Sequence, residues 1–122
     1  MFSVDVQNRT PVWEQICNEV RKYIMLGILN PDDRLPSVRE LAMETGVNPN
    51  TIAKAYSDLV AKGLIVAAGG RGYFVSKDAQ TALLNAAESR MTEFEEIART
   101  LILSGIEKET LISVINQIKK GE

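Results

Sequence analysis

Apolar residues recur every three or four positions through five stretches of the chain, which is the spacing of one face of an α-helix. These stretches span residues 11–26, 38–45, 49–62, 79–104 and 111–118. Two short apolar runs, at 64–67 and 73–75, flank a glycine-rich segment at 69–72. Short apolar runs joined by a glycine-rich tip predict a β-hairpin. The predicted fold class is therefore mostly α with a small β-hairpin.

Residues with strong capping preferences mark the ends of the first two helices. Thr10 is a good N-cap, and Pro11 suits the first helical position after it. Ser37 and Glu40 stand at the N-cap and the third helical position of the next helix, which predicts a capping box. Gly46 is expected to end that helix, because glycine adopts the left-handed conformation at little cost.

The spacing of Ala42, Gly46 and Ile52 is typical of a helix-turn-helix. A small residue lets two helices cross closely, a glycine makes the tight turn, and an aliphatic residue anchors the second helix. Asn48 and Pro49 suit the N-cap and first position of that second helix. With a helix before it and a hairpin after it, the motif predicts a winged helix-turn-helix. In that fold the third helix enters the major groove and the hairpin tip reaches the adjacent backbone or minor groove.

Several ordered sequence runs lie in this part of the chain. It reads LPSVRELA at 35–42, GVNPNTI at 46–52, AY at 55–56, GLI at 63–65 and GRGYFV at 70–75. In this order the runs resemble the DNA-binding domain of GntR-family regulators, and the resemblance covers about residues 10–76. The short helical segment that follows resembles the YtrA subfamily, whose members carry two dimerising helices in place of a large ligand-binding domain. The resemblance implies a bacterial-type transcription regulator.

Polar and basic residues around the motif are candidates for contact with DNA. The predicted DNA-binding residues are Ser37, Arg39, Asn48, Asn50, Thr51, Lys54, Arg71 and Gly72. Arg39 resembles the family's guanine-contacting arginine, and its fork of donors suits a guanine edge or a phosphate. Asn50 and Lys54 share a helix edge opposite Ile52. Asparagine can pair with adenine and lysine with phosphate, while Thr51 can contact a thymine methyl or a phosphate.

Each of these candidates also has an ordinary structural explanation. Arg39 and the polar residues of the third helix could be solvated surface residues. Ser37 and Asn48 serve first as helix caps, and any phosphate contact would be additional. Pro49 stands where several relatives of this family have arginine, which removes one base-reading candidate and leaves the operator sequence open.

The glycine-rich segment at 69–72 has two interpretations. A glycine loop can cradle nucleotide phosphates, but it then follows a strand, precedes a helix and usually continues into Lys-Ser/Thr. This segment lies instead between two strand-like runs, which favours the tip of a wing. Arg71 at that tip would reach into the minor groove or onto a phosphate.

The C-terminal apolar stripe is expected to form a dimer interface. Its predicted dimerisation residues are Leu83, Ala87, Met91, Phe94, Leu101, Leu111, Ile115 and Ile118. Two helices of this size cannot enclose a sizeable core, so they must pack against the winged helix, another copy, or both. Since helix-turn-helix domains usually bind symmetric sites as dimers, dimerisation is the favoured use. The predicted domains are a winged helix-turn-helix DNA-binding domain at 1–76 and a helical dimerisation segment at 77–122.

The charge of the chain is unevenly distributed. The net charge of −2 is unlike that of a typical DNA-binding protein. Residues 1–77 hold nine Lys/Arg against eight Asp/Glu, whereas residues 78–122 hold five against eight. The acidity therefore lies in the C-terminal third, and a local basic face on the first part remains possible.

Composition argues against an enzyme, a metal site and a cofactor site. The chain has no histidine, which is the usual general base and the commonest metal ligand. Its single cysteine, Cys17, cannot form an internal disulfide or supply a zinc site, and is interpreted as a packing residue. No apolar run approaches the length of a membrane span and no signal-peptide pattern is present, so a cytoplasmic location is expected.

The sequence therefore predicts a DNA-binding transcriptional regulator, with repression favoured, that binds a palindromic operator as a homodimer. A winged helix used as a protein-interaction module is one alternative. The N-terminal part of an aminotransferase-type fusion is another, although the chain continues into amphipathic helices rather than a polar linker. No polar constellation marks a small-molecule pocket, so any effector, and the regulated genes, stay open.

Overall fold

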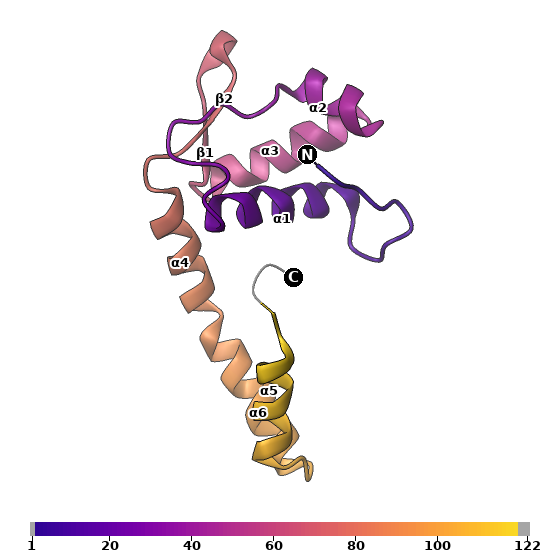
Figure 1. Ribbon diagram of the computed structural model, residues 1–122, viewed down its shortest axis with the longest axis vertical. Helices are drawn as coiled ribbons and strands as arrows, with labels where there is room; N and C mark the ends of the chain where they lie inside the picture. Colours follow the sequence, from indigo (N-terminus) through magenta and orange to yellow (C-terminus); the bar gives the residue numbers. More distant parts are fainter. Residues whose placement is uncertain (1, 120–122) are drawn as a thin grey trace. The chain divides into compact units, whose positions relative to one another are not determined.

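The computed structural model of the protein describes residues 2–119, and Figure 1 shows its helices and strands. In chain order the elements are α1 (Val12–Met25), α2 (Val38–Thr45), α3 (Pro49–Ala61), β1 (Ile65–Ala67), the 3-10 turn η1 (Gly69–Arg71), β2 (Tyr73–Val75), α4 (Ala79–Ser89), α5 (Met91–Leu103) and α6 (Lys108–Gln117). This order confirms the predicted fold class of a mostly helical chain with one small hairpin. The chain forms two compact units, one ending at Leu83 and one beginning at Leu84. The outer limits of the predicted domains, at 1 and 122, lie outside the described residues.

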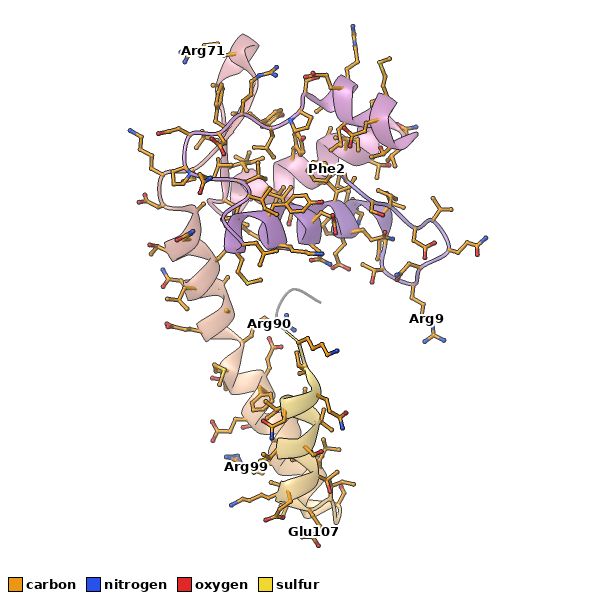
Figure 2. All side chains as sticks on the ribbon, viewed as in Figure 1. Phe2, Arg9, Arg71, Arg90, Arg99 and Glu107 are labelled. Atoms are coloured by element: carbon orange, nitrogen blue, oxygen red, sulfur yellow. The ribbon has the colours of Figure 1, made fainter. Side chains whose placement is uncertain are left out.

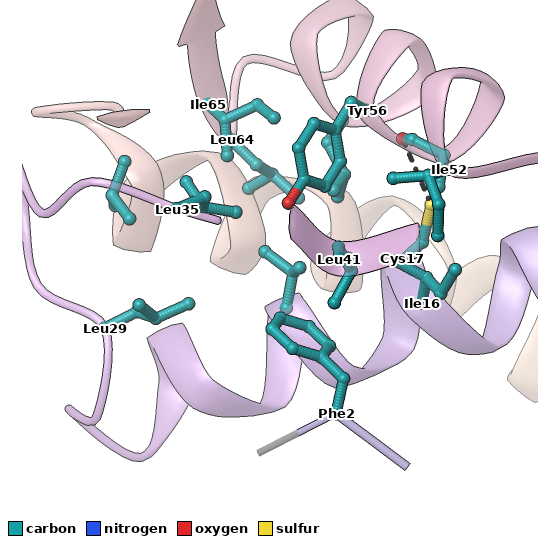
Figure 3. Close-up of a cluster of buried hydrophobic side chains, with 14 of the residues drawn as sticks. Phe2, Ile16, Cys17, Leu29, Leu35, Leu41, Ile52, Tyr56, Leu64 and Ile65 are labelled. Carbon is teal, nitrogen blue, oxygen red and sulfur yellow. Dashed lines mark hydrogen bonds between the residues drawn. The ribbon is translucent and has the colours of Figure 1, made fainter. Parts of the chain in front are cut away.

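The N-terminal unit is built around a core of buried apolar side chains (Figure 3). Helices α1 and α3 pack against each other, and α2 packs against α3. The largest side chains that are fully buried are Tyr56, Ile16, Ile24, Leu35, Leu41, Ile52, Leu59 and Ile65. Burying such a side chain contributes about 1.5–3 kcal/mol to stability. Ala79 of α4 is also fully buried, so this core extends past the hairpin into the first turn of α4.

The first turn of α2 carries the predicted capping box. The backbone N–H of Glu40 donates to Ser37 Oγ at 3.0 Å, and the backbone N–H of Ser37 donates to Glu40 Oε1 at 2.9 Å. The hydrogen bond from the Ser37 backbone is the largest cause of a lowered pKa of Glu40. Gly46 ends α2 in the left-handed conformation, with φ of 71°, as expected.

The predicted start of α1 is wrong by one position. Pro11 is the N-cap, with φ −54° and ψ 147°, and no side chain caps the helix. Thr10 lies outside the helix in a local turn, because its backbone N–H donates to Asn8 Oδ1 at 2.9 Å. The Gln15 side chain reaches back from α1 and donates to the carbonyl oxygen of Thr10 at 2.9 Å. That contact secures the entry to the helix without a capping hydroxyl.

The hairpin pairs β1 and β2 as antiparallel strands, with Ile65 opposite Val75. A segment before α2 lies along the other edge of β2, which the sequence did not predict. The backbone N–H of Leu35 donates to the carbonyl oxygen of Tyr73 at 2.9 Å, and that of Val75 donates to Asp33 at 2.8 Å. Residues 30–33 are a cluster of turn-favouring residues, and the backbone N–H of Asp33 closes a turn on the carbonyl oxygen of Asn30 at 3.0 Å. The last residues of this cluster also pair with the hairpin and tie it to the start of α2.

The regular structure of the unit beginning at Leu84 is all helical, but the predicted helix that leads into this unit is divided. The apolar spacing predicted one helix over 79–104, whereas the structure ends α4 at Ser89 and begins α5 at Met91. The Arg90 N–H bonds to the Ala87 carbonyl three residues back at 3.1 Å, and this interrupts the four-residue ladder. The last helix ends at Gln117, so Ile118 lies one position beyond it in an extended conformation. No residue from 84 to 119 is buried.

Candidate nucleic-acid interface

Helix α3 has one fully buried side and one polar edge. Ile52 and Leu59 are fully buried, along with Ala55 and Tyr56. Asn50 and Lys54, on the opposite edge, are exposed, and so is Ser57 one turn further along. Residues three and four apart lie on the same side of a helix, so this edge is continuous. Asn48 precedes the helix as its N-cap, and its Oδ1 accepts the backbone N–H of Asn50 at 2.8 Å, as its predicted cap role requires.

The predicted phosphate-binding lysine of this edge is engaged with α1. The Lys54 ammonium lies over the ring of Trp13, 4.8 Å from its centroid. Such a cation–π contact at an exposed site contributes about 0.5–1 kcal/mol. Lys54 therefore lies on the α1 side of the edge, and Thr51 is half-buried on α3. Asn50 and Lys54 are thus the exposed ones among the predicted contacts within α3.

Arg39 lies on the first turn of α2 with its side chain exposed. Among residues 2–119 it forms no ion pair, so its donors are available to a ligand. The positive end of the α2 dipole adds to its charge at this point. Ser37, one of the predicted contacts, holds the cap of the same turn.

The hairpin forms a wing whose tip is η1, and Figure 2 shows the Arg71 side chain extending from that tip. Arg71 is exposed. Gly72 has φ 102° and ψ −154°, a region that residues with a Cβ essentially never occupy. Its carbonyl oxygen accepts the Ala68 N–H at 2.8 Å and closes the turn. Glycine is therefore required at this position by the backbone, whether or not it also contacts DNA.

Tyr56 connects the three elements around the interface. Its hydroxyl donates to the carbonyl oxygen of Pro36, just before α2, at 2.6 Å. Its ring packs edge-to-face on Tyr73 of β2, with 4.8 Å between the ring centroids. Burial is the main cause of a raised pKa of the Tyr56 hydroxyl, which stays protonated and able to donate. The apolar spacing of α3 predicts a core position at Tyr56. It does not show that the hydroxyl positions α3 against α2 and the wing.

Arg34 is a basic residue of this region that the sequence predictions did not include. Its Nη1 lies 3.6 Å from Glu40 Oε1. Its guanidinium covers Gly72, so a Cβ built on that glycine would lie 3.3 Å from Arg34 Nε. The signal available in the sequence was a single arginine between a turn cluster and a capping box. Its proximity to the wing depends on the strand pairing of 32–35, which the sequence did not reveal.

The single cysteine of the chain lies in the core of the N-terminal unit. Cys17 is fully buried, as its interpretation as a packing residue requires, and its thiol donates to the carbonyl oxygen of Ala55 at 3.4 Å. Burial raises the pKa of this thiol to about 11, so it is a poor nucleophile. Within residues 2–119 no three metal-binding side chains come together. None of the helices in that range is long and apolar enough to cross a bilayer.

Comparison with known proteins places this architecture in a family. The model of bacterial regulatory proteins of the gntR family matches residues 13–75. The transcriptional repressor YtrA of Bacillus subtilis is 39% identical over 97% of this chain and 92% of its own length. A GntR family transcriptional regulator from Listeria monocytogenes superposes with a TM-score of 0.72 at 30% identity, covering 93% of this chain and 99% of that one.

A solved structure of the AraR DNA-binding domain in complex with its operator ORX1 is similar to the N-terminal part. It has a TM-score of 0.57 and 34% identity, and covers 62% of this chain and 96% of that domain. The similarity to YtrA continues through the C-terminal helices, which agrees with the resemblance to that subfamily. These relatives are named as transcription regulators and not as enzymes. The chain belongs to the GntR family of bacterial regulatory proteins.

Proposed function

We propose that the protein is a transcriptional repressor that binds a palindromic DNA operator in the cytoplasm as a homodimer. The observation that carries the proposal is the polar edge of α3, which is uncovered while the opposite side of the helix is fully buried. Such an edge next to a wing suits insertion into a major groove. Relatives named as repressors, and the AraR domain seen with its operator, support the same reading.

In this mechanism α3 lies in the major groove and α2 crosses the DNA backbone. Asn50 reads adenine and Arg39 reads guanine through its paired donors. Thr51 and Lys54 contact phosphate or, for Thr51, a thymine methyl, and Arg71 probes the adjacent minor groove from the wing. For Lys54 this requires the ammonium to swing from the Trp13 ring, at a cost small compared with a phosphate contact.

The second unit supports the proposal of a dimer. From Leu84 onward no described residue is buried, while Phe94, Ile97 and Ile115 remain about half exposed or more. An apolar helical face of this kind is typical of an interface with another chain. A two-fold dimer would place two copies of α3 one helical turn apart, about 34 Å, on inverted half-sites.

The test is a titration of the protein with DNA from upstream of its own gene and with random duplex, each at several salt concentrations. Specific binding should exceed random binding by about 10³-fold or more, and both affinities should fall steeply with salt. No salt-dependent affinity for any duplex would overturn the proposal. That result would favour the alternative of a winged helix that binds another protein.

A further inference from the structure

Arg34 lies between the wing and the first turn of α2. Its backbone pairs with Phe74 of β2, and the next residue, Leu35, is buried and hydrogen-bonded to Tyr73. The base of the side chain is therefore fixed to the sheet. Its guanidinium reaches Gly72 on one side and Glu40 on the other. The guanidinium therefore lies between α2 and the wing, which both face DNA in the proposed function.

The guanidinium is held by a partner that a phosphate can replace. The Arg34 side chain is 52% exposed and the Glu40 side chain 59% exposed, so water solvates both charges. An ion pair this exposed contributes little to stability. A phosphate accepts the same guanidinium donors as a carboxylate does. Without Arg34, the Glu40 carboxylate would still accept the hydrogen bond from the backbone N–H of Ser37.

Gly72 provides the space that Arg34 occupies. A Cβ at Gly72 would lie 3.3 Å from Nε of Arg34, which is tighter than most such contacts, and 3.6 Å from Nη2, which is ordinary van der Waals contact. Any other residue at 72 would therefore strain the backbone, and its Cβ would crowd the Arg34 guanidinium, which would have to shift slightly. The glycine that the wing turn requires is therefore also the residue against which the Arg34 guanidinium packs.

We propose that Arg34 is a further DNA-binding residue, which exchanges Glu40 for a backbone phosphate between the groove read by α3 and the groove reached by the wing. This inference rests on the proposed function, because it requires α2 and the wing to face DNA. In the free protein the guanidinium lies beside Glu40, with Nη1 3.6 Å from Oε1. A phosphate contact carries no base information, so Arg34 adds affinity and register rather than sequence preference.

The test compares Arg34→Gln with Arg99→Gln on operator and random duplex. Arg99 is a matched control, since its side chain is also 52% exposed and pairs with Glu95 on α5 at 2.9 Å. Arg34→Gln should weaken binding about tenfold on both duplexes and make the slope of log K against log salt shallower by about 0.9. Arg99→Gln should leave affinity and slope as in the parent protein.

A second pair of variants examines the exchange itself. Glu40→Gln keeps a capping residue at this position and should tighten DNA binding, because Arg34 is released. That gain should shrink when Glu40→Gln is combined with Arg34→Gln, giving a nonzero coupling in the double-mutant cycle. Arg34→Lys should keep the salt slope while recovering part of the lost affinity, which a folding defect would not do.

Unchanged affinity and slope for Arg34→Gln, in a protein that binds its operator normally, would overturn this inference and leave the proposed function intact. A loss confined to the operator would equally overturn the phosphate assignment. Absence of DNA binding by the parent protein would overturn the proposed function instead.

Discussion

The two units of the chain differ most in what they bury. Every buried core residue lies in the unit that ends at Leu83, whereas no residue from 84 to 119 is buried. Leu103 on α5 is 82% exposed and Ile97 is 61% exposed, values unlike those of Ile52 or Leu59 at 0%. The amphipathic spacing of the two units is nevertheless similar. Apolar residues at helical spacing therefore predict that one face of a helix is buried, but not whether the same chain or another chain buries it.

The first prediction breaks the second unit and should have the largest effect. Replacing Phe94 and Leu101 by aspartate places charge on its apolar face, so we expect monomers in sedimentation velocity. Losing the second half-site contact should weaken operator binding about a hundredfold or more. Thr92→Asp adds charge at an exposed position on the opposite side of α5 and should leave a dimer. If the doubly substituted chain still sediments as a dimer, these helices have another role.

The second prediction contrasts a core side chain with a side chain of the proposed dimer interface. Ile52→Ala opens a cavity in the N-terminal core and should cost about 2–5 kcal/mol in urea unfolding, at every protein concentration. Ile115→Ala should give a loss that changes with protein concentration, because it acts through association. Equal, concentration-independent losses for the two variants would contradict the distinction between the units.

The third prediction concerns the exposed face of the N-terminal unit. Arg39→Ala should cost about 1–3 kcal/mol on the operator and relax preference at one base, since the proposed mechanism assigns this side chain to a base edge. Lys54→Ala should instead weaken operator and random duplex alike, because phosphate contacts are independent of sequence. Competition binding with single-base operator variants separates the two. Equal losses on specific and random DNA for Arg39→Ala would remove its assigned role.

The fourth prediction is the smallest and compares helix ends. Helix α2 has a complete capping box, whereas α5 has no side-chain cap. Ser37→Ala should therefore cost about 1 kcal/mol of stability. The pKa of Glu40 in the folded state lies below its ordinary value of 4.5. The ionised carboxylate therefore stabilises the folded protein above pH 4.5, and this stabilisation is lost as the pH falls through the folded-state pKa. The difference in urea midpoint between Glu40→Gln and the parent chain should therefore be smaller at acidic pH than at neutral pH. A difference that does not change with pH would contradict this.

Local signals in the sequence were sufficient for the helix-turn-helix and the hairpin. Ser37, Glu40 and Gly46 act through hydrogen bonds and dihedral angles within a few residues, so their roles are visible in the sequence. The apolar spacing around Ile52 likewise identified the buried side of α3. The polar edge of the candidate interface followed directly from that spacing.

Features that depend on tertiary contacts were missed. The pairing of 32–35 with β2 joins segments some forty residues apart, and it brings Arg34 to Gly72. The Tyr56 hydroxyl reaches Pro36 across twenty positions. The break at Arg90 is invisible to periodicity, because the apolar positions on either side keep helical spacing. Each of these features depends on a contact with a distant backbone group or on a local hydrogen bond, which the spacing of apolar residues does not show.

The most direct test of the account is selection of duplexes from a randomised pool by the purified protein, followed by the mass of the complex on the enriched sequence. The account predicts two inverted half-sites, one helical turn or about 34 Å apart, carrying two chains per duplex. Enrichment of no sequence, or of a single half-site bound by one chain, would contradict it.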